Sequence, residues 1–308
     1  MSTLLPQAAV IPKRSSEVGL ARARLMIPPA LVAMALLDAL LCRARGLQFT
    51  NWSQLALVTL GVAAVGLGYR LTGRSRRLGR VAFWVVLWIV FSVVGGVLTY
   101  AVAARGGPLW DARFAALDRA IGFEWTTWFG FVNRHPAIKL PLALAYASLM
   151  PQILLAIFRF SWREGDPRNG ELLGAVIFSL LLTTALFKLL PSLGPGLSVP
   201  AFRELYLDDL LALRNGAATV FAMPHLRGLI AFPSFHAVLA VLFTHAHRGR
   251  PGFVAILVLN AVMLLSVPSE GGHYLVDVVA GLAIAAAAIL GLHCLRRHER
   301  ALLLPHLA

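Results

Sequence analysis

Two histidines lie at the openings of two apolar segments, among residue types that acid–base and nucleophilic chemistry requires. His236 ends the run Phe-Pro-Ser-Phe-His, and His273 begins the run His-Tyr-Leu-Val-Asp, which ends at Asp277. An ionisable side chain at the end of a membrane segment is costly to desolvate and marks a functional site by default. Because histidine changes its charge near neutral pH, the pair predicts catalysis at a membrane surface.

The spacing of His273 and Asp277 makes this prediction more specific. Residues four apart at the start of a helix share one face, so the carboxylate reaches one nitrogen of the imidazole. That hydrogen bond fixes the tautomer and leaves the other nitrogen as a nucleophile or base. Gly271 and Gly272 precede the histidine and let backbone N–H groups approach an anion, which the start of a helix also favours.

The segment before His236 has similar features, because Pro233 suits the first turn of a helix and Ser234 offers a hydroxyl. Two anion-binding helix starts, two histidines and one aspartate indicate phosphoryl transfer. In that mechanism neutral His273, oriented by Asp277, attacks phosphorus and forms a phosphohistidine, while His236 protonates the departing alkoxide. Water or an alcohol then takes the phosphoryl group.

These residues resemble the type 2 phosphatidic acid phosphatase superfamily. Its pattern is a K-x-x-x-x-x-x-R-P segment, a P-S-G-H segment and an S-R-x-x-x-x-x-H-x-x-x-D segment on three loops of a six-helix core. Residues 233–236 match the second segment with Phe in place of Gly, and residues 273–277 match the end of the third. The Ser-Arg of the third segment reads Ser266-Val267, and no Arg-Pro follows Lys188 at the distance that the first segment requires.

These departures are similar to one branch, the inositol phosphorylceramide synthase-like and sphingomyelin synthase-like lipid phosphotransferases. In that branch a proline-rich loop replaces the first segment, and residues 191–196 (Pro-Ser-Leu-Gly-Pro-Gly) would form it here. The resemblance covers about residues 81–295, including the Leu-Asp-Arg-Ala-Ile-Gly-Phe stretch at 117–123. It implies a lipid head-group phosphotransferase that needs no metal and no cofactor, with membrane phospholipids or lipid phosphates as its partners.

The sequence therefore predicts His236, His273 and Asp277 as catalytic residues. The residues expected to bind the substrate are Ser234, Lys188, Arg214, Gly271 and Gly272. Arg214 is the candidate for the missing motif arginine because it lies in the same long loop, 191–229. Lys188, near the end of an apolar run, either contacts phosphate or extends to the membrane interface.

Composition predicts an all-α, polytopic membrane protein, because 58% of the residues are hydrophobic, 14% are charged, and the mean hydropathy is +0.75. A spanning helix needs about 20 apolar residues. Eight apolar runs approach that length, and they cover Met26–Cys42, Trp52–Tyr69, Val81–Ala104, Leu140–Phe158, Glu171–Leu190, Ile230–Thr244, Phe253–Val267 and His273–Leu295.

The runs divide the chain into four parts. Residues 1–25 form a basic tail, 26–80 two additional spans, 81–295 a six-span catalytic core, and 296–308 a second basic tail. Lys and Arg are more frequent in the tails and even-numbered loops, which predicts cytoplasmic termini and an active site that faces the outer side. The formal net charge of +14 is therefore attributed to membrane orientation, and nucleic acid is not expected as a partner.

One further helix is expected between the third and fourth spans. Trp110, Phe114, Leu117 and Ile121 recur at helical spacing and form one apolar stripe. Charged residues interleave the stripe, as is typical of a helix that lies in the membrane interface. A helix packed on the bundle fits the same pattern, and both interpretations stay open.

Three alternatives to the phosphotransferase remain. The same chemistry with water as the acceptor gives a lipid phosphate phosphatase. His236, His273 and Asp277 also have the composition of a two-histidine, one-carboxylate metal site, although no further ligand is evident. A transporter that binds a phosphorylated lipid is the third, but transporters place broken helices and charges near the middle of the membrane.

Overall fold

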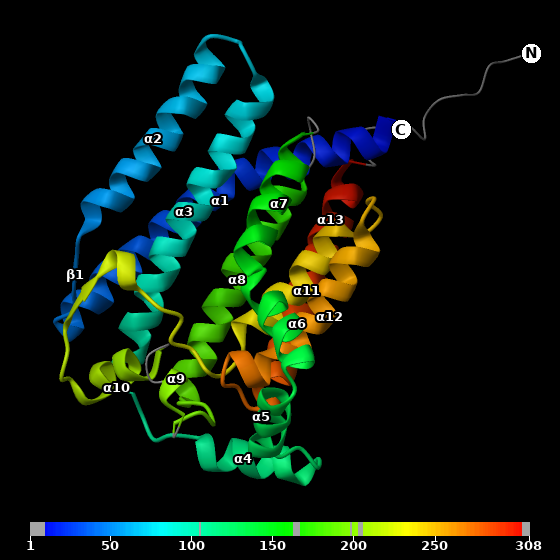
Figure 1. Ribbon diagram of the computed structural model, residues 1–308. Coiled ribbons are helices and arrows are strands. Elements are labelled where there is room, and N and C mark those ends of the chain that lie inside the picture. Colours follow the sequence, from blue (N-terminus) through cyan, green and yellow to red (C-terminus); the bar gives the residue numbers. More distant parts are fainter. Residues whose placement is uncertain (1–9, 105, 163–166, 198, 203–205, 304–308) are drawn as a thin grey trace, which may run out of the picture.

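The chain folds as an all-α bundle, as its composition predicts. The computed structural model describes residues 10–104, 106–162, 167–197, 199–202 and 206–303. The predicted tails, 1–25 and 296–308, lie partly outside these ranges. Those of their residues that the structure describes, 10–25 and 296–303, belong to the first and last helices. The long helices run along one common direction (Figure 1), and they are α1 (Val10–Arg45), α2 (Trp52–Leu71), α3 (Arg76–Ala103), α8 (Arg168–Leu189), α12 (Phe253–Glu270) and α13 (Leu275–Leu303).

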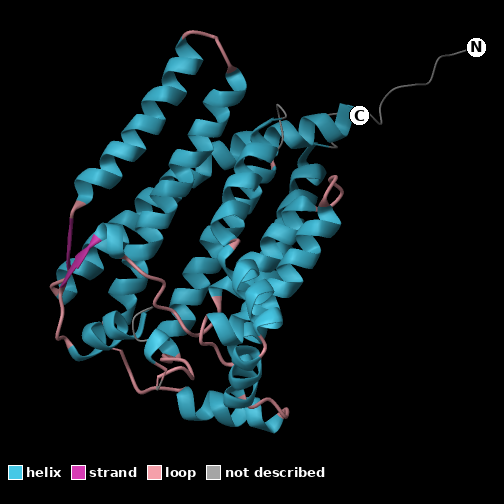
Figure 2. Cartoon of the chain, viewed as in Figure 1, coloured by secondary structure: helices cyan, strands magenta, loops and turns pink. Residues whose placement is uncertain are grey.

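The shorter elements gather mainly at one end of this bundle, the lower end in Figure 1. They include the helices α4 (Asp111–Ala120), α5 (Trp125–Arg134), α9 (Pro200–Phe202) and α10 (Asp208–Asn215). Two three-residue strands, β1 (Gln48–Thr50) and β2 (Val220–Ala222), pair in parallel beside them (Figure 2). This pairing, which the sequence did not predict, joins the α1–α2 connection to the long 191–229 loop.

Among the residues that the structure describes, six helices are long and apolar enough to span a membrane, which makes the chain an integral membrane protein. They are α2, α3, α8, α12, Leu25–Arg45 of α1 and Leu275–His298 of α13. The prediction of about eight spans counted two further runs, and the structure modifies both of them.

The predicted span Leu140–Phe158 is broken into α6 (Pro136–Ala147) and α7 (Leu149–Trp162), which meet at an angle of 46°. Pro151 explains the break, since its ring removes one backbone N–H and clashes with the carbonyl of residue 147 in a continuous helix. The Ser148 hydroxyl donates to the Ala145 carbonyl at the break. The bent pair counts as a seventh span if it crosses as one unit.

The predicted span Ile230–Thr244 is shortened to α11 (Phe235–His247). Ser234 caps the helix by accepting the Ala237 N–H, so residues 230–233 remain outside it. At a rise of about 1.5 Å per residue, these 13 residues cover about 20 Å, which is less than the hydrocarbon thickness of about 30 Å. Helix α11 alone is therefore too short to cross the hydrocarbon layer.

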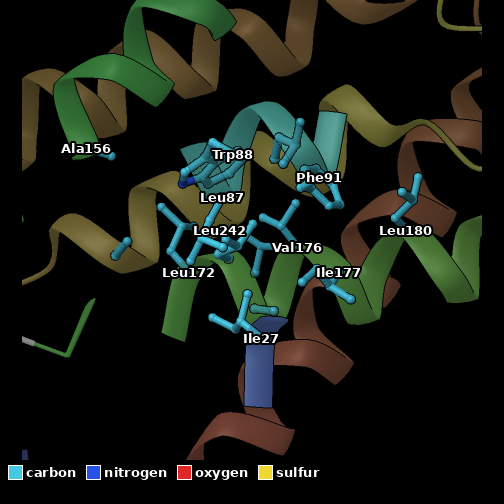
Figure 3. Packing of buried hydrophobic residues seen from close by; sticks show 14 of the residues in the cluster. Ile27, Leu87, Trp88, Phe91, Ala156, Leu172, Val176, Ile177, Leu180 and Leu242 are labelled. Carbon is cyan, nitrogen blue, oxygen red and sulfur yellow. The ribbon is translucent and has the colours of Figure 1, made fainter. Parts of the chain in front are cut away.

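The main apolar core joins α1, α3, α7, α8, α11 and α13. Trp88 and Phe91 of α3 pack against Val176 and Ile177 of α8, and Ile27 of α1 closes the cluster from the other side (Figure 3). By contrast, α2 packs chiefly on α3 and exposes most of its apolar surface. Of the two additional N-terminal spans, α1 is thus an integral part of the bundle.

A close crossing of α11 and α13 brings their starts together. A Cβ at Gly281 of α13 would lie 2.5 Å from the Ser234 carbonyl oxygen and 2.9 Å from the Ala237 Cβ. Only glycine allows this approach. The crossing thus brings the start of α11, which carries His236, against the first turns of α13.

The variant Gly281→Ala should therefore destabilise the protein. The added methyl overpacks the crossing, and such changes cost about 1–3 kcal/mol. We expect a lower midpoint of thermal unfolding in detergent. Gly291→Ala on the same helix is the matched control, because a Cβ there meets nothing within 4 Å. Equal melting of both variants would contradict the proposed crossing.

Candidate active site

His273 and Asp277 form the pair that their spacing predicts. His273 Nδ1 lies 3.2 Å from Asp277 Oδ2, and both side chains are buried. His273 itself precedes α13, which begins two residues later than predicted. Asp277 reaches back from the first turn and also accepts the Tyr274 N–H at 2.9 Å. The carboxylate thus orients the imidazole with Nδ1 toward itself, so that Nε2 is the nitrogen not bonded to Asp277.

His236 lies in the first turn of α11, and its ring stacks on Tyr146 of α6. The ring centroids are 4.1 Å apart and the planes differ by 16°. Tyr146 lies beside the break between α6 and α7, so the broken span places this ring against the histidine. The adjacent Ser234 is completely buried, and its N–H donates to the Asp277 carbonyl at 3.0 Å.

Tyr146 also links His236 to His273. A Cβ at Gly271 would lie 2.9 Å from the Tyr146 hydroxyl oxygen and 2.7 Å from His273 Cδ2, so these two atoms flank the same point. The charges of the two imidazoles are also close enough to interact. The two histidines therefore share one site. Gly271 is required there, because a side chain at this position would displace the rings of Tyr146 and His273.

The electrostatics of His273 suit a nucleophile. Burial lowers the pKa of His273 to about 4, and a hydrogen bond with the backbone of Ala231 opposes this shift. The imidazole is therefore neutral at neutral pH, and a neutral nitrogen carries the lone pair that attacks an electrophile.

Helix α4 holds the start of α13 through Asp118. The buried Asp118 carboxylate accepts the Leu275 N–H at 2.7 Å and the Val276 N–H at 3.0 Å. Burial raises the pKa of Asp118, and these two hydrogen bonds oppose that shift. The amides predicted to hold a substrate anion at this helix start are thus already bound to a carboxylate of the chain.

Asp111, two turns before Asp118, binds the proline-rich loop in the same way. Its carboxylate accepts the Ser192 hydroxyl at 2.8 Å and the N–H groups of Leu193 and Gly194 at 3.0 and 2.9 Å. A Cβ at Gly194 would lie 2.4 Å from the Gly272 carbonyl oxygen, so this loop adjoins the residues before His273. Phe114 between the two aspartates packs on Phe232 and Tyr274.

The apolar stripe of α4 is therefore partly packed on the bundle and partly exposed, so that each of the two interpretations holds for part of it. Phe114 is buried against the bundle, whereas Leu117 and Ile121 are exposed. The helix packs on the site through one side and offers the other to the membrane interface.

The two glycines expected to bind substrate differ in whether their backbone N–H group is free. The Gly271 N–H donates to the Val267 carbonyl and is not available to an anion. Gly272 has a φ of +64°, and its N–H makes no hydrogen bond within the described part of the chain.

Lys188 and Arg214, which the sequence predicts to bind the substrate, lie near each other. With Arg45 they form an outer cation cluster, in which the charge of Lys188 interacts with both arginines. Arg214 donates to the Gly107 carbonyl at 2.6 Å, and Arg45 donates to the Ala104 carbonyl. Burial lowers the pKa of Arg214, and the nearby charge of Asp111 opposes this shift. Within the described residues, neither Lys188 nor Arg214 is bonded to His236, His273 or Asp277.

The position of the missing motif arginine is filled by an apolar residue. Val267 is completely buried and packs with Ala237 and Val278, and Tyr146 lies against this cluster. As for the metal alternative, the described residues contain no group of three or more His, Cys, Asp or Glu side chains placed to hold an ion.

The fold and the paired histidines define a polytopic helical membrane protein with a buried two-histidine site. A family model described as the PAP2 superfamily matches residues 112–291, which is more than half of the chain. The chain therefore belongs to the PAP2 superfamily, and the predicted type 2 phosphatidic acid phosphatase relationship is confirmed. No match is found among curated proteins or among solved structures. Membership supports a reaction of the lipid phosphatase or phosphotransferase type on membrane lipids.

Sequence reasoning missed three residues of this site. Asp118 lies in the stretch that carries the resemblance, and its burial between charged neighbours is not readable from the sequence. In the sequence, Asp111 is only one of the charged residues that interleave the apolar stripe of α4. Tyr146 gave one weak signal, a tyrosine within an apolar run.

Replacing Asp118 should loosen the start of α13. The variant Asp118→Ala leaves two buried N–H groups without an acceptor, and we expect a loss of about 1–3 kcal/mol in the free energy of unfolding. Hydrogen exchange at Leu275 and Val276 should accelerate, as measured by mass spectrometry of the peptide that contains them. Glu124→Ala, an exposed carboxylate in the α4–α5 connection, is the control. Unchanged exchange in Asp118→Ala would contradict the capping role.

Proposed function

We propose that this protein is a lipid head-group phosphotransferase that works through a phosphohistidine on His273. The observation that supports this proposal most directly is the shared site of His273, Asp277 and His236, with Tyr146 between the two imidazoles. The same chemistry with water as the acceptor is the alternative, a lipid phosphate phosphatase.

The first half-reaction uses both histidines. His273 Nε2 attacks phosphorus with its lone pair, and the bond from phosphorus to the lipid oxygen breaks. The phosphoryl anion bound beside His236 favours the protonated form of this buried imidazole, which gives its proton to the departing oxygen. Asp277 stabilises the positive charge that develops on the His273 ring. The products are a phosphohistidine and a lipid alcohol.

The second half-reaction reverses these roles. The hydroxyl of an acceptor alcohol approaches the phosphohistidine and gives its proton to neutral His236 while its oxygen attacks phosphorus. The bond from phosphorus to His273 Nε2 breaks, and both histidines return to their starting state. An alcohol yields a new phosphoester. Water yields free phosphate from a phosphomonoester donor and the head-group phosphate from a phosphodiester donor.

Two features favour a phosphodiester donor, and hence the transferase. Val267 replaces the motif arginine, as in the lipid phosphotransferase branch that the sequence resembles. In addition, the carboxylates of Asp111 and Asp118 are near enough for their charges to act on Asp277. A phosphodiester carries one negative charge, whereas a phosphomonoester carries about 1.5 to 2 at neutral pH. The lower charge is repelled less in such surroundings.

We further propose that the remaining predicted residues act around this centre. Gly272 offers its N–H to a phosphoryl oxygen, and Ser234 fixes the start of α11 beside it. Arg214 and Lys188 attract the anionic lipid from the outer cation cluster. The site faces the non-cytoplasmic side, and the helices from Val81 to Leu295 form the catalytic unit.

The catalytic assignment is tested with purified protein and a labelled phospholipid. We expect His273→Ala to lose activity by at least about 10³-fold and to form no covalent phosphate, because no nucleophile remains. Wild-type protein should give an acid-labile, base-stable phosphoprotein. His225→Ala is the control, since this histidine is exposed in the outer loop. Near-normal activity of His273→Ala would refute the mechanism.

The acceptor is tested in the same assay with and without inositol or diacylglycerol. The transferase predicts that the label moves to the added alcohol, and His236→Ala should slow this transfer strongly. Free phosphate as the sole labelled product, at every acceptor concentration, would instead establish the hydrolase.

The pH dependence of the first half-reaction follows from His273. Its lone pair is present above the folded-state pKa of about 4 and is lost as the pH falls through that value. We expect kcat/KM to fall about tenfold per pH unit below about 4. An activated nitrophenyl ester, whose leaving group needs no proton, isolates this acid limb, which should persist in His236→Ala. An acid limb centred above about pH 6 would contradict neutral His273 as the nucleophile.

A further inference from the structure

The structure assigns a substrate-binding role to Tyr146: we infer that its hydroxyl donates a hydrogen bond to a phosphoryl oxygen in place of the missing motif arginine. This inference rests on the proposed function. It concerns a residue on α6, a helix that carries none of the three family segments.

The first support is position. Val267 holds the place of the arginine, and its side chain is buried in a cluster with Ala237 and Val278. Tyr146 packs against this same cluster from the neighbouring helix. The aromatic side chain thus covers the apolar residue that replaced the cation.

The second support is the direction of the hydroxyl. The Tyr146 oxygen and His273 Cδ2 lie 2.9 Å and 2.7 Å from the point that a Cβ at Gly271 would occupy. Cδ2 is bonded to Nε2, the nitrogen that Asp277 leaves free. The hydroxyl therefore lies beside the edge of His273 at which phosphorus must arrive.

The third support is an unused donor. Within the described residues, the Tyr146 hydroxyl has no hydrogen-bond partner. Glu270 is near enough for its charge to act on Tyr146, but no hydrogen bond joins them. Tyr206 is different, because its hydroxyl already donates to the Leu193 carbonyl at 3.0 Å. A phenol held beside the reacting atoms without a partner is suited to bind an oxygen of the substrate.

A neutral donor also bears on the choice of substrate. An arginine would offer a full positive charge and two parallel hydrogen bonds, which suits a doubly charged phosphomonoester. A tyrosine offers one hydrogen bond and no charge. Tyr146 thereby favours a singly charged phosphodiester of the kind found in phospholipid head groups.

The test compares Tyr146→Phe with wild-type protein, because phenylalanine keeps the ring that stacks on His236. The probe is inorganic orthovanadate, which adopts the geometry of a phosphoryl group under attack, and its binding is measured by titration calorimetry. We expect Tyr146→Phe to bind vanadate about tenfold more weakly, because it loses one hydrogen bond to a charged group. Tyr69→Phe on α2 is the control and should bind as wild type does.

A second measurement separates substrate contact from positioning of His236. Bis(4-nitrophenyl) phosphate has leaving groups that need no proton, so its turnover does not depend on His236. If Tyr146 contacts the phosphoryl group, Tyr146→Phe should lower kcat/KM for this ester by about tenfold as well. A loss confined to unactivated esters would show that Tyr146 acts through His236 and would overturn the inference.

The outcomes distinguish this inference from the proposed function. Wild-type affinity for vanadate in Tyr146→Phe, combined with lost binding in His273→Ala, would overturn the role of Tyr146 and leave the histidine mechanism intact. Absence of vanadate binding in the wild type would overturn both.

Discussion

The site depends on how the first turn of α13 satisfies its backbone N–H groups. A helix start has N–H groups without partners inside the helix, and they are costly to bury where water is scarce. Two carboxylates meet this requirement, Asp277 from within the helix and Asp118 from α4. The orientation of His273 follows, because the Asp277 oxygen that accepts the Tyr274 N–H also binds the imidazole. His273 is thus fixed by the same contacts that satisfy the start of α13.

This constraint explains why α4 must lie where it does. Asp118 and Asp111 are two helical turns apart, so they point in one direction and reach two different segments. One carboxylate holds the start of α13 and the other holds the proline-rich loop. Phe114 fills the space between them with an apolar contact. The loop and the helix start are therefore held in register by one short helix of ten residues.

The sequence predicts those parts of the fold that depend on local pattern. Continuous apolar runs identified the segments of the bundle, and the spacing of His273 and Asp277 identified their pairing, because both signals lie within one element. The exact helix starts were predicted less well. Hydropathy alone treats two runs as continuous, but Ser234 caps the start of α11 within one of them, and Pro151 breaks the other. Capping and proline sterics act on single residues, so they alter boundaries without changing the average of a run.

Contacts between distant segments were not predictable in the same way. The β1–β2 pairing joins residues that no periodicity connects, and three-residue strands carry little pattern. Tyr146 reaches His236 only because α6 ends at residue 147 and crosses α12 and the start of α11. Even the superfamily resemblance does not indicate this residue, because it lies outside the three motif segments.

The arrangement also bears on how the proposed site would bind a phosphoester. The positive charges of Arg45, Lys188 and Arg214 lie near one another, with Asp111 close to Arg214, and in the proposed function they attract the anionic lipid. Among the described residues, two neutral donors without a hydrogen-bond partner lie beside the histidines, one backbone N–H at Gly272 and one phenol at Tyr146. In the proposed function the cations attract the substrate and these neutral donors bind it, which limits the charge that the buried centre can accept. Since α1 contributes both Arg45 and part of the apolar core, the segment ahead of the family match is part of the bundle that holds the site.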